Sequence, residues 1–74
     1  MPTAEINRNT MNKDYDLISV LYHALQAADT SAQYGEDAQN EGSEEVAEFM
    51  KNVEEQNRKI AAQAKELLLK QKQA

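Results

Sequence analysis

Residues 41–43 read Glu41-Gly42-Ser43, and this short stretch divides one long helical pattern into two. Glycine readily takes the left-handed conformation that follows a helix C-terminus. Serine is a preferred N-cap, because its hydroxyl accepts a hydrogen bond from a free backbone N–H. A stop signal followed at once by a start signal leaves a connection of about two or three residues, so the two helices must fold back on each other. The sequence therefore predicts an all-α antiparallel helical hairpin.

The segment before the turn, about residues 14–40, has the period of an amphipathic helix. Apolar and small side chains recur there at steps of three and four residues, which places them on one face. The members of this stripe are Leu17, Ile18, Leu21, Leu25, Ala28, Ala32 and Gly35. The small residues lie nearest the turn and leave room for large side chains of the second helix, with Phe49 and Met50 as the candidates. Residues 1–13 show no sustained apolar period, and we expect them to form a flexible N-terminal tail.

We expect a second helix at about residues 43–72, after the turn. Together with the first helix it forms a hairpin domain over residues 14–74. Its apolar positions follow a heptad-like seam. At about 1.5 Å per residue each helix is about 40 Å long, and two such helices cannot bury both apolar faces alone. Pairing two hairpins into an antiparallel four-helix bundle is the simplest remedy, so we expect a homodimer. The expected dimer and core seam contains Ile18, Leu21, Leu25, Val46, Phe49, Val53, Asn57, Ile60 and Leu67.

Size and charge limit the classes of function. A chain of 74 residues without cysteine has neither a disulfide nor a thiolate metal site, and a core this small supplies only about 3–5 kcal/mol. The formal net charge of −5 gives no basic footprint for nucleic acid and disfavours docking on an anionic membrane. No stretch approaches the roughly 20 apolar residues of a membrane span. We therefore expect a soluble, cytoplasmic protein.

The residues with chemically reactive or metal-binding side chains favour structural roles. His23 is the only histidine and has no carboxylate at ligand spacing in the sequence. Asn57 is the one polar residue in the middle of the second seam, where a buried amide typically fixes helix register. The acidic residues around the turn are typical of a solvated face, and no phosphate loop, nucleophile elbow, zinc helix or EF-hand loop is present. We predict a protein that is not an enzyme and that holds no metal and no cofactor.

The stretch from Gly35 to Met50, continued from Glu54 to Ala61, resembles ferritin-like proteins of the rubrerythrin kind. In that family a long helix ends in an Ala-x-x-Glu-Gly turn, and the next helix opens with an acidic residue before it reaches a Glu-x-x-His metal motif. Asn57 stands where the ligand glutamate of that motif would stand, Ile60 where its histidine would stand, and Ala24 near the bridging glutamate of the first helix. The resemblance implies half of a ferritin-like bundle, completed by dimerisation, without an active di-iron centre.

Three hypotheses of function follow. The first is a small, soluble, non-enzymatic hairpin that acts as a homodimeric structural or binding module. The second is a divergent ferritin-like protein that binds iron through His23, Asp29, Glu36 and Glu55 across two chains. The third is a hairpin that docks its apolar face on a different partner protein.

Overall fold

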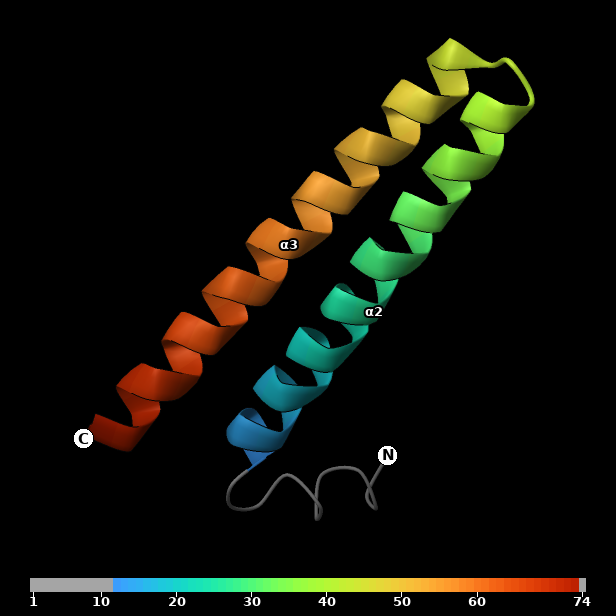
Figure 1. The fold of residues 1–74 in the computed structure, drawn as a ribbon. Coiled ribbons are helices and arrows are strands. Elements are labelled where there is room, and N and C mark those ends of the chain that lie inside the picture. The colour runs from blue at the N-terminus through green and yellow to red at the C-terminus, as the bar shows by residue number, and fades with distance from the viewer. Residues whose placement is uncertain (1–11, 74) are drawn as a thin grey trace, which may run out of the picture.

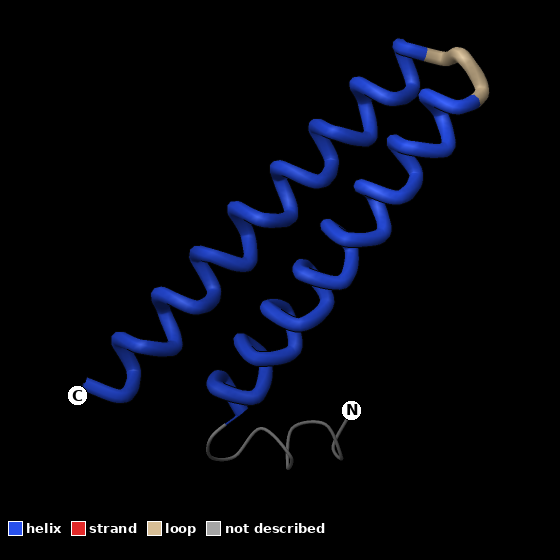
Figure 2. Tube along the Cα trace, viewed as in Figure 1, coloured by secondary structure: helices blue, strands red, loops and turns tan. Residues whose placement is uncertain are grey.

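The computed structural model describes residues 12–73, which form two long helices joined by a short turn. Helix α2 runs over Asn12–Asn40 (29 residues) and helix α3 over Glu44–Gln73 (30 residues). The helices lie side by side and antiparallel (Figure 1). The turn between them is the only non-helical segment within the described range (Figure 2). The predicted all-α helical hairpin is confirmed.

The helix boundaries fall close to those expected from the sequence. Helix α2 begins at Asn12, two residues before the expected start, so residues 12 and 13 of the predicted tail are helical. The rest of that predicted tail, residues 1–11, lies outside the described residues. Helix α3 begins at Glu44, one residue after the expected start, and ends at Gln73, one residue after the expected end.

The turn owes its geometry to Gly42. Its φ of 78° lies in the left-handed region, which glycine reaches without a side-chain clash. The N–H of Gly42 donates to the carbonyl of Gln39 at 3.0 Å, and the N–H of Ser43 donates to the carbonyl of Ala38 at 2.9 Å. These two bonds form a Schellman motif, which satisfies the last carbonyls of α2. The carbonyl of Ser43 then accepts the first bond of α3, from the N–H of Ala47 at 3.0 Å, which places Ser43 at the predicted N-cap position.

Small side chains line the interface between α2 and α3. The buried side chains are those of Ala24, Ala28, Ser31 and Ala38 on α2 and Ala61 and Ala64 on α3. Together with half-buried neighbours they advance by alternating steps of four and three residues, a heptad repeat that we call the seam. The seam comprises Leu17, Leu21, Ala24, Ala28, Ser31, Gly35 and Ala38 on α2, Ser43 at the N-cap position, and Ala47, Met50, Glu54, Asn57, Ala61, Ala64 and Leu68 on α3.

The residues of the expected dimer and core seam divide between this interface and the outside of the hairpin. Leu21, Val53 and Asn57 are half-buried. The other six are exposed in the single hairpin: Ile18, Leu25, Val46, Phe49, Ile60 and Leu67. On α3 the physical reason is that two heptad series lie side by side, the seam with its small buried alanines and a second series of bulky residues. The small series faces α2, because small side chains let two helices approach more closely.

Gly35 shows, at a single position, which residues of α3 face α2. A Cβ atom at Gly35 would lie 3.7 Å from the Cβ of Met50 and 3.8 Å from the carbonyl oxygen of Ala47. Met50 is half-buried there, whereas the side chain of Phe49 is 60% exposed. Of the two candidates for the space near the small residues, Met50 occupies it and Phe49 lies outside.

Candidate interaction surface

Large apolar side chains cover the outside of the hairpin. Among the side chains of residues 12–71 none of the large ones is fully buried, and eleven large apolar ones are exposed. They are Tyr15, Ile18, Val20, Tyr22, Leu25, Tyr34, Val46, Phe49, Ile60, Leu67 and Leu69. Single exposed apolar residues are ordinary on protein surfaces, but contiguous apolar patches mark sites of interaction.

The helical repeat sorts the exposed residues into two faces of the hairpin. Successive residues of a helix point about 100° apart, so the residue after each seam position lies on one side of the hairpin and the residue before it lies on the other. Asp29 follows Ala28, and Arg58 follows Asn57. Their ion pair, at 3.3 Å, shows that the following residues of both helices share one side. We call that side the ion-pair face and the opposite side the stripe face.

The stripe face carries an uninterrupted uncharged strip along α3. Seven residues of α3 precede seam positions there, five of them apolar and two of them glutamine. This strip, the α3 stripe, comprises Val46, Phe49, Val53, Gln56, Ile60, Gln63 and Leu67. It extends over about 30 Å of helix. Beside it, α2 contributes the exposed side chains of Val20 and Tyr34 together with those of Asp16, His23 and Asp37. The apolar surface of the stripe face therefore belongs mainly to α3.

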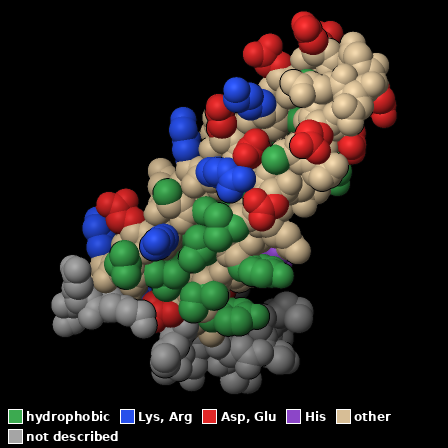
Figure 3. Space-filling model, in the orientation of Figure 1, with side chains coloured by type: hydrophobic (Ala, Val, Ile, Leu, Met, Phe, Trp, Pro, Cys, Tyr) green, Lys and Arg blue, Asp and Glu red, His purple; other side chains and the backbone are tan. Residues whose placement is uncertain are grey.

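The ion-pair face is divided along its length. Its apolar residues lie away from the turn, where Tyr15, Ile18, Tyr22 and Leu25 of α2 lie on the same side as Leu69 of α3. Figure 3 shows, on one face of the molecule, hydrophobic side chains gathered over the half away from the turn and acidic side chains gathered around the turn. Seven-residue steps place Lys51, Arg58 and Lys65 on α3 along this same face. Charged groups interrupt its apolar surface.

Arg58 is the polar centre of the ion-pair face. Its guanidinium donates to the carboxylate of Glu54, with Nη2 at 3.0 Å and Nε at 3.2 Å from Oε2. Nη2 also lies 3.3 Å from Oδ1 of Asp29 on the other helix. These bonds, first to Glu54 and then to Asp29, raise the pKa of Arg58 above its ordinary value. Arg58 thus links α2 to α3 at the midpoint of the hairpin.

A polar groove lies on the same face, between Arg58 and the turn. Its volume is about 430 Å³, and small residues such as Ala32, Gly35 and Ala47 line it together with several charged side chains. The charged members are Glu36, Glu44, Glu48, Lys51 and Glu54. The groove is an open acidic depression near the turn.

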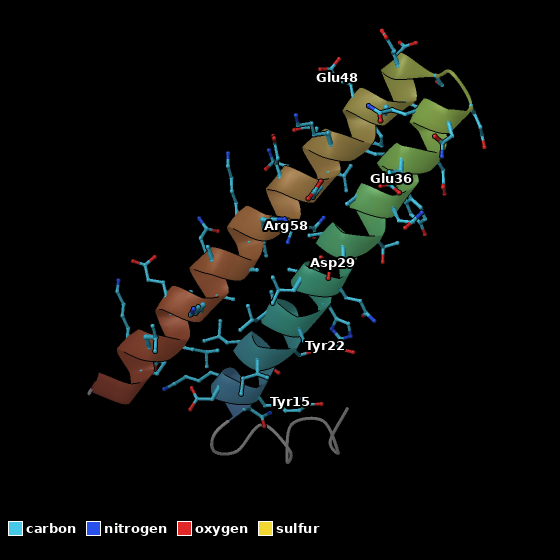
Figure 4. The ribbon with its side chains drawn as sticks, in the orientation of Figure 1. Tyr15, Tyr22, Asp29, Glu36, Glu48 and Arg58 are labelled. Carbon is cyan, nitrogen blue, oxygen red and sulfur yellow. The ribbon has the colours of Figure 1, made fainter. Side chains whose placement is uncertain are left out.

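The four candidate metal residues occupy separate places. Nδ1 of His23 donates to the backbone carbonyl of Ser19 at 2.9 Å, one turn back on α2. Asp29 pairs with Arg58, whereas Glu36 lines the polar groove and Glu55 lines a second depression of about 610 Å³ beside Phe49. Figure 4 shows Asp29 and Glu36 along one strip of α2 with Tyr15 and Tyr22. Among residues 12–73, no group of three or more His, Cys, Asp or Glu side chains is placed to hold a metal ion.

Asn57 satisfies its amide within its own helix. Its Nδ2 donates to the backbone carbonyl of Val53 at 3.0 Å, and the side chain is half-buried in the seam. The predicted contribution of Asn57 to helix register in a dimer stays a prediction. Sequence reasoning overlooked Tyr34 on α2, although seven-residue steps from Val20 through Ala27 could have placed it on the same face.

Comparisons with known proteins assign no family to this chain. Neither a family model nor a curated protein sequence nor a solved structure matches the chain. The resemblance to ferritin-like proteins therefore stays a prediction. Neither α2 nor α3 has a segment apolar enough to cross a lipid bilayer.

Proposed function

We propose that this protein is a small homodimeric helical module, in which two hairpins join their stripe faces to form a four-helix bundle. One observation carries the proposal: the side chains buried between α2 and α3 are alanines and a serine, while the α3 stripe lies largely exposed. Each large apolar side chain left in water forgoes about 1.5–3 kcal/mol of burial free energy. A second hairpin laid on the stripe face recovers that free energy.

The size of the face suits this arrangement. With a rise of about 1.5 Å per residue and helix diameters of about 10 Å, one face of the hairpin measures on the order of 900 Å². A standard stable interface buries about 800 Å² on each partner. Two stripe faces in contact would therefore form an interface of ordinary size, with the seam of each hairpin directly beneath it.

The module acts, in this proposal, through its surfaces and not through catalysis. The groups that catalysis would use already have partners in the hairpin: His23 donates to the carbonyl of Ser19 within α2, and Arg58 donates to Glu54 and, across the helices, to Asp29. The outer helix surfaces of the bundle would present the ion-pair face to the surroundings, as a scaffold or a binding surface. The expected soluble, cytoplasmic state of the protein stays part of this proposal, as does its ferritin-like origin.

Sedimentation of the full chain over a range of concentrations tests the dimer. We expect the mass of two chains for the wild type and of one chain for Ile60→Asp, because the substitution puts a charge in the middle of the α3 stripe. Val53→Asp should act in the same way. Leu69→Asp is the matched control: Leu69 is 54% exposed and Ile60 is 43% exposed, but Leu69 lies on the ion-pair face. Leu69→Asp should stay dimeric.

Two outcomes would overturn the proposal. A wild-type chain that stays monomeric at every concentration contradicts self-association, and a monomer with loosely packed helices would favour docking on a different protein. An Ile60→Asp variant that keeps the mass and helicity of the wild type would show that the stripe face is not the contact.

A further inference from the structure

The hairpin is electrically polarised along its length. The half that contains the turn, residues 29–56, has nine acidic side chains against a single lysine. The half away from the turn, residues 12–28 and 57–71, has five basic side chains against three acidic ones. The acidic residues of the turn half are Asp29, Glu36, Asp37, Glu41, Glu44, Glu45, Glu48, Glu54 and Glu55, and the basic residues of the other half are Lys13, Arg58, Lys59, Lys65 and Lys70. One end is therefore strongly negative and the other weakly positive.

We infer that the two hairpins of the dimer pack with their turns at opposite ends, so that the acidic turn half of each lies along the basic half of the other. The inference rests on the proposed dimer and specifies its partner, a second copy of this chain, and its orientation. A two-fold dimer that joins stripe face to stripe face has two solutions. The two-fold axis runs either along the hairpins, with both turns at one end, or across them, with the turns at opposite ends.

Charge favours one of the two solutions through a weak, long-range effect. Because Asp29, Glu36, Glu44, Glu48 and Glu55 follow seam positions, they lie on the ion-pair face, and salt with a Debye length of about 8 Å screens their charges across the dimer. With both turns at one end, the two acidic halves would repel each other over their whole length. With the turns at opposite ends, each acidic half instead meets the half that carries Lys59, Lys65 and Lys70.

The α3 stripe supports the same orientation independently of charge. An axis across the hairpins sets α3 antiparallel to the α3 of the second copy, so the stripe packs on itself. Val46 and Leu67 lie equally far from the midpoint of the stripe, and so do Val53 and Ile60. Apolar residues then meet apolar residues at matched levels. The other axis would set the stripe against α2 of the second copy, where Asp37 lies on the stripe face.

Residues 1–11 are a poor alternative cover for the stripe. Their large apolar side chains are Met1, Ile6 and Met11, separated by polar residues. Three such side chains do not match a strip of about 30 Å that has apolar residues along its whole length. A second copy supplies an equal stripe and the complementary charge together.

Spin labels at the turn measure the orientation. Because the chain has no cysteine, Glu41→Cys gives one label per chain at the tip of the hairpin. We expect a label-to-label distance on the order of 45 Å or more, the length of a helix of about 30 residues. Turns at one end would give a distance on the order of 20–30 Å, about the width of the bundle.

A mixed dimer provides the reciprocal measurement. Chains labelled with a donor through Glu41→Cys are mixed with chains labelled with an acceptor through Lys70→Cys, and energy transfer is recorded. Transfer should be strong, because the tip of one hairpin lies beside the open end of the other. A dimer with a short turn-to-turn distance and weak mixed transfer would overturn the orientation while leaving the proposed dimer intact. A monomer in sedimentation would overturn both.

Discussion

Gly35 offers the sharpest test of how closely α2 and α3 pack. It lies inside α2 and in the seam, with helical backbone geometry. A Cβ atom there would meet the Cβ of Met50 at 3.7 Å and the carbonyl oxygen of Ala47 at 3.8 Å, which are ordinary van der Waals distances. Gly35→Ala should therefore fit without displacing either helix. Glycine inside a helix costs about 0.5–1 kcal/mol relative to alanine, so the substitution should raise the free energy of unfolding by about 1 kcal/mol.

Gly42→Ala is the matched control, because it adds the same methyl group at a position where only the backbone conformation disfavours a side chain. Nothing lies within 4 Å of a Cβ built at Gly42, but its φ is 78°. A left-handed conformation costs an L-residue with a Cβ about 1–2 kcal/mol. Gly42→Ala should therefore lower the free energy of unfolding by about that amount, opposite in sign to Gly35→Ala.

Urea unfolding followed by far-ultraviolet circular dichroism measures both variants. All samples need the same chain concentration, because self-association would stabilise the folded state by mass action. For a domain of this size 1 kcal/mol shifts Tm by about 4–8 °C, so thermal melts should resolve the pair. A destabilised Gly35→Ala variant would refute the close but uncrowded packing of the seam, and a neutral Gly42→Ala variant would refute the left-handed turn.

Three further predictions concern the cap, the ion pair and metal binding. Ser43→Ala should lower the free energy of unfolding by about 1 kcal/mol, since Ser43 holds the N-cap position of α3; an unchanged urea midpoint would count against that role. The raised pKa of Arg58 contributes stability that is fully present below the pKa in the unfolded chain and is lost only at strongly alkaline pH. The difference in urea midpoint between Arg58→Gln and the wild type should thus be constant from about pH 6 to 9, and a difference that changes within this window would contradict the assignment. Iron, manganese or zinc ions added to metal-free protein should leave Tm unchanged, because Asp29 is held by Arg58 and His23 by Ser19. A rise in Tm of several degrees would support the metal hypothesis.

The turn and the helices could be predicted from the sequence because their causes are local. Gly42 and Ser43 act through the conformation of one residue and the hydrogen bonds of the next few. The start of α2 at Asn12 and of α3 at Glu44 differ from expectation by two residues and one residue. Such ends depend on the balance of a few terminal hydrogen bonds, which periodicity does not resolve.

The choice of packed face could not be predicted in the same way. On α3, Ile60 belongs to a heptad series of bulky residues and Ala61 to the adjacent series. Either series is a plausible packing face, and hydrophobicity favours the bulky one. The structure pairs the small series with α2, and Ala61 and Ala64 are buried there together with Ala24 and Ala28. Packing distance is a property of the two helices together, so neither helix pattern alone reveals it.

The polar contacts across the hairpin were also beyond sequence reasoning. Asp29 and Arg58 are 29 residues apart, and their meeting depends on the register of α2 against α3. Within the hairpin the amide of Asn57 donates to the carbonyl of Val53, one turn back, and its predicted contribution to helix register stays a prediction. A residue type at a heptad position indicates that a polar group lies in the seam, but not which partner it finds.

The alanine-rich seam also bears on the order in which the molecule acquires its structure. Alanine loses no rotamer entropy when it is buried, so closing α2 onto α3 immobilises few side chains. The short link at Gly42 keeps the loop-closure entropy small, and pairing can advance from the turn one helical turn at a time. Long side chains such as Phe49 and Leu67 keep their torsional freedom until a second surface covers them. Folding of the hairpin is then a local, rapid event, and in the proposed dimer most of the side-chain ordering belongs to assembly.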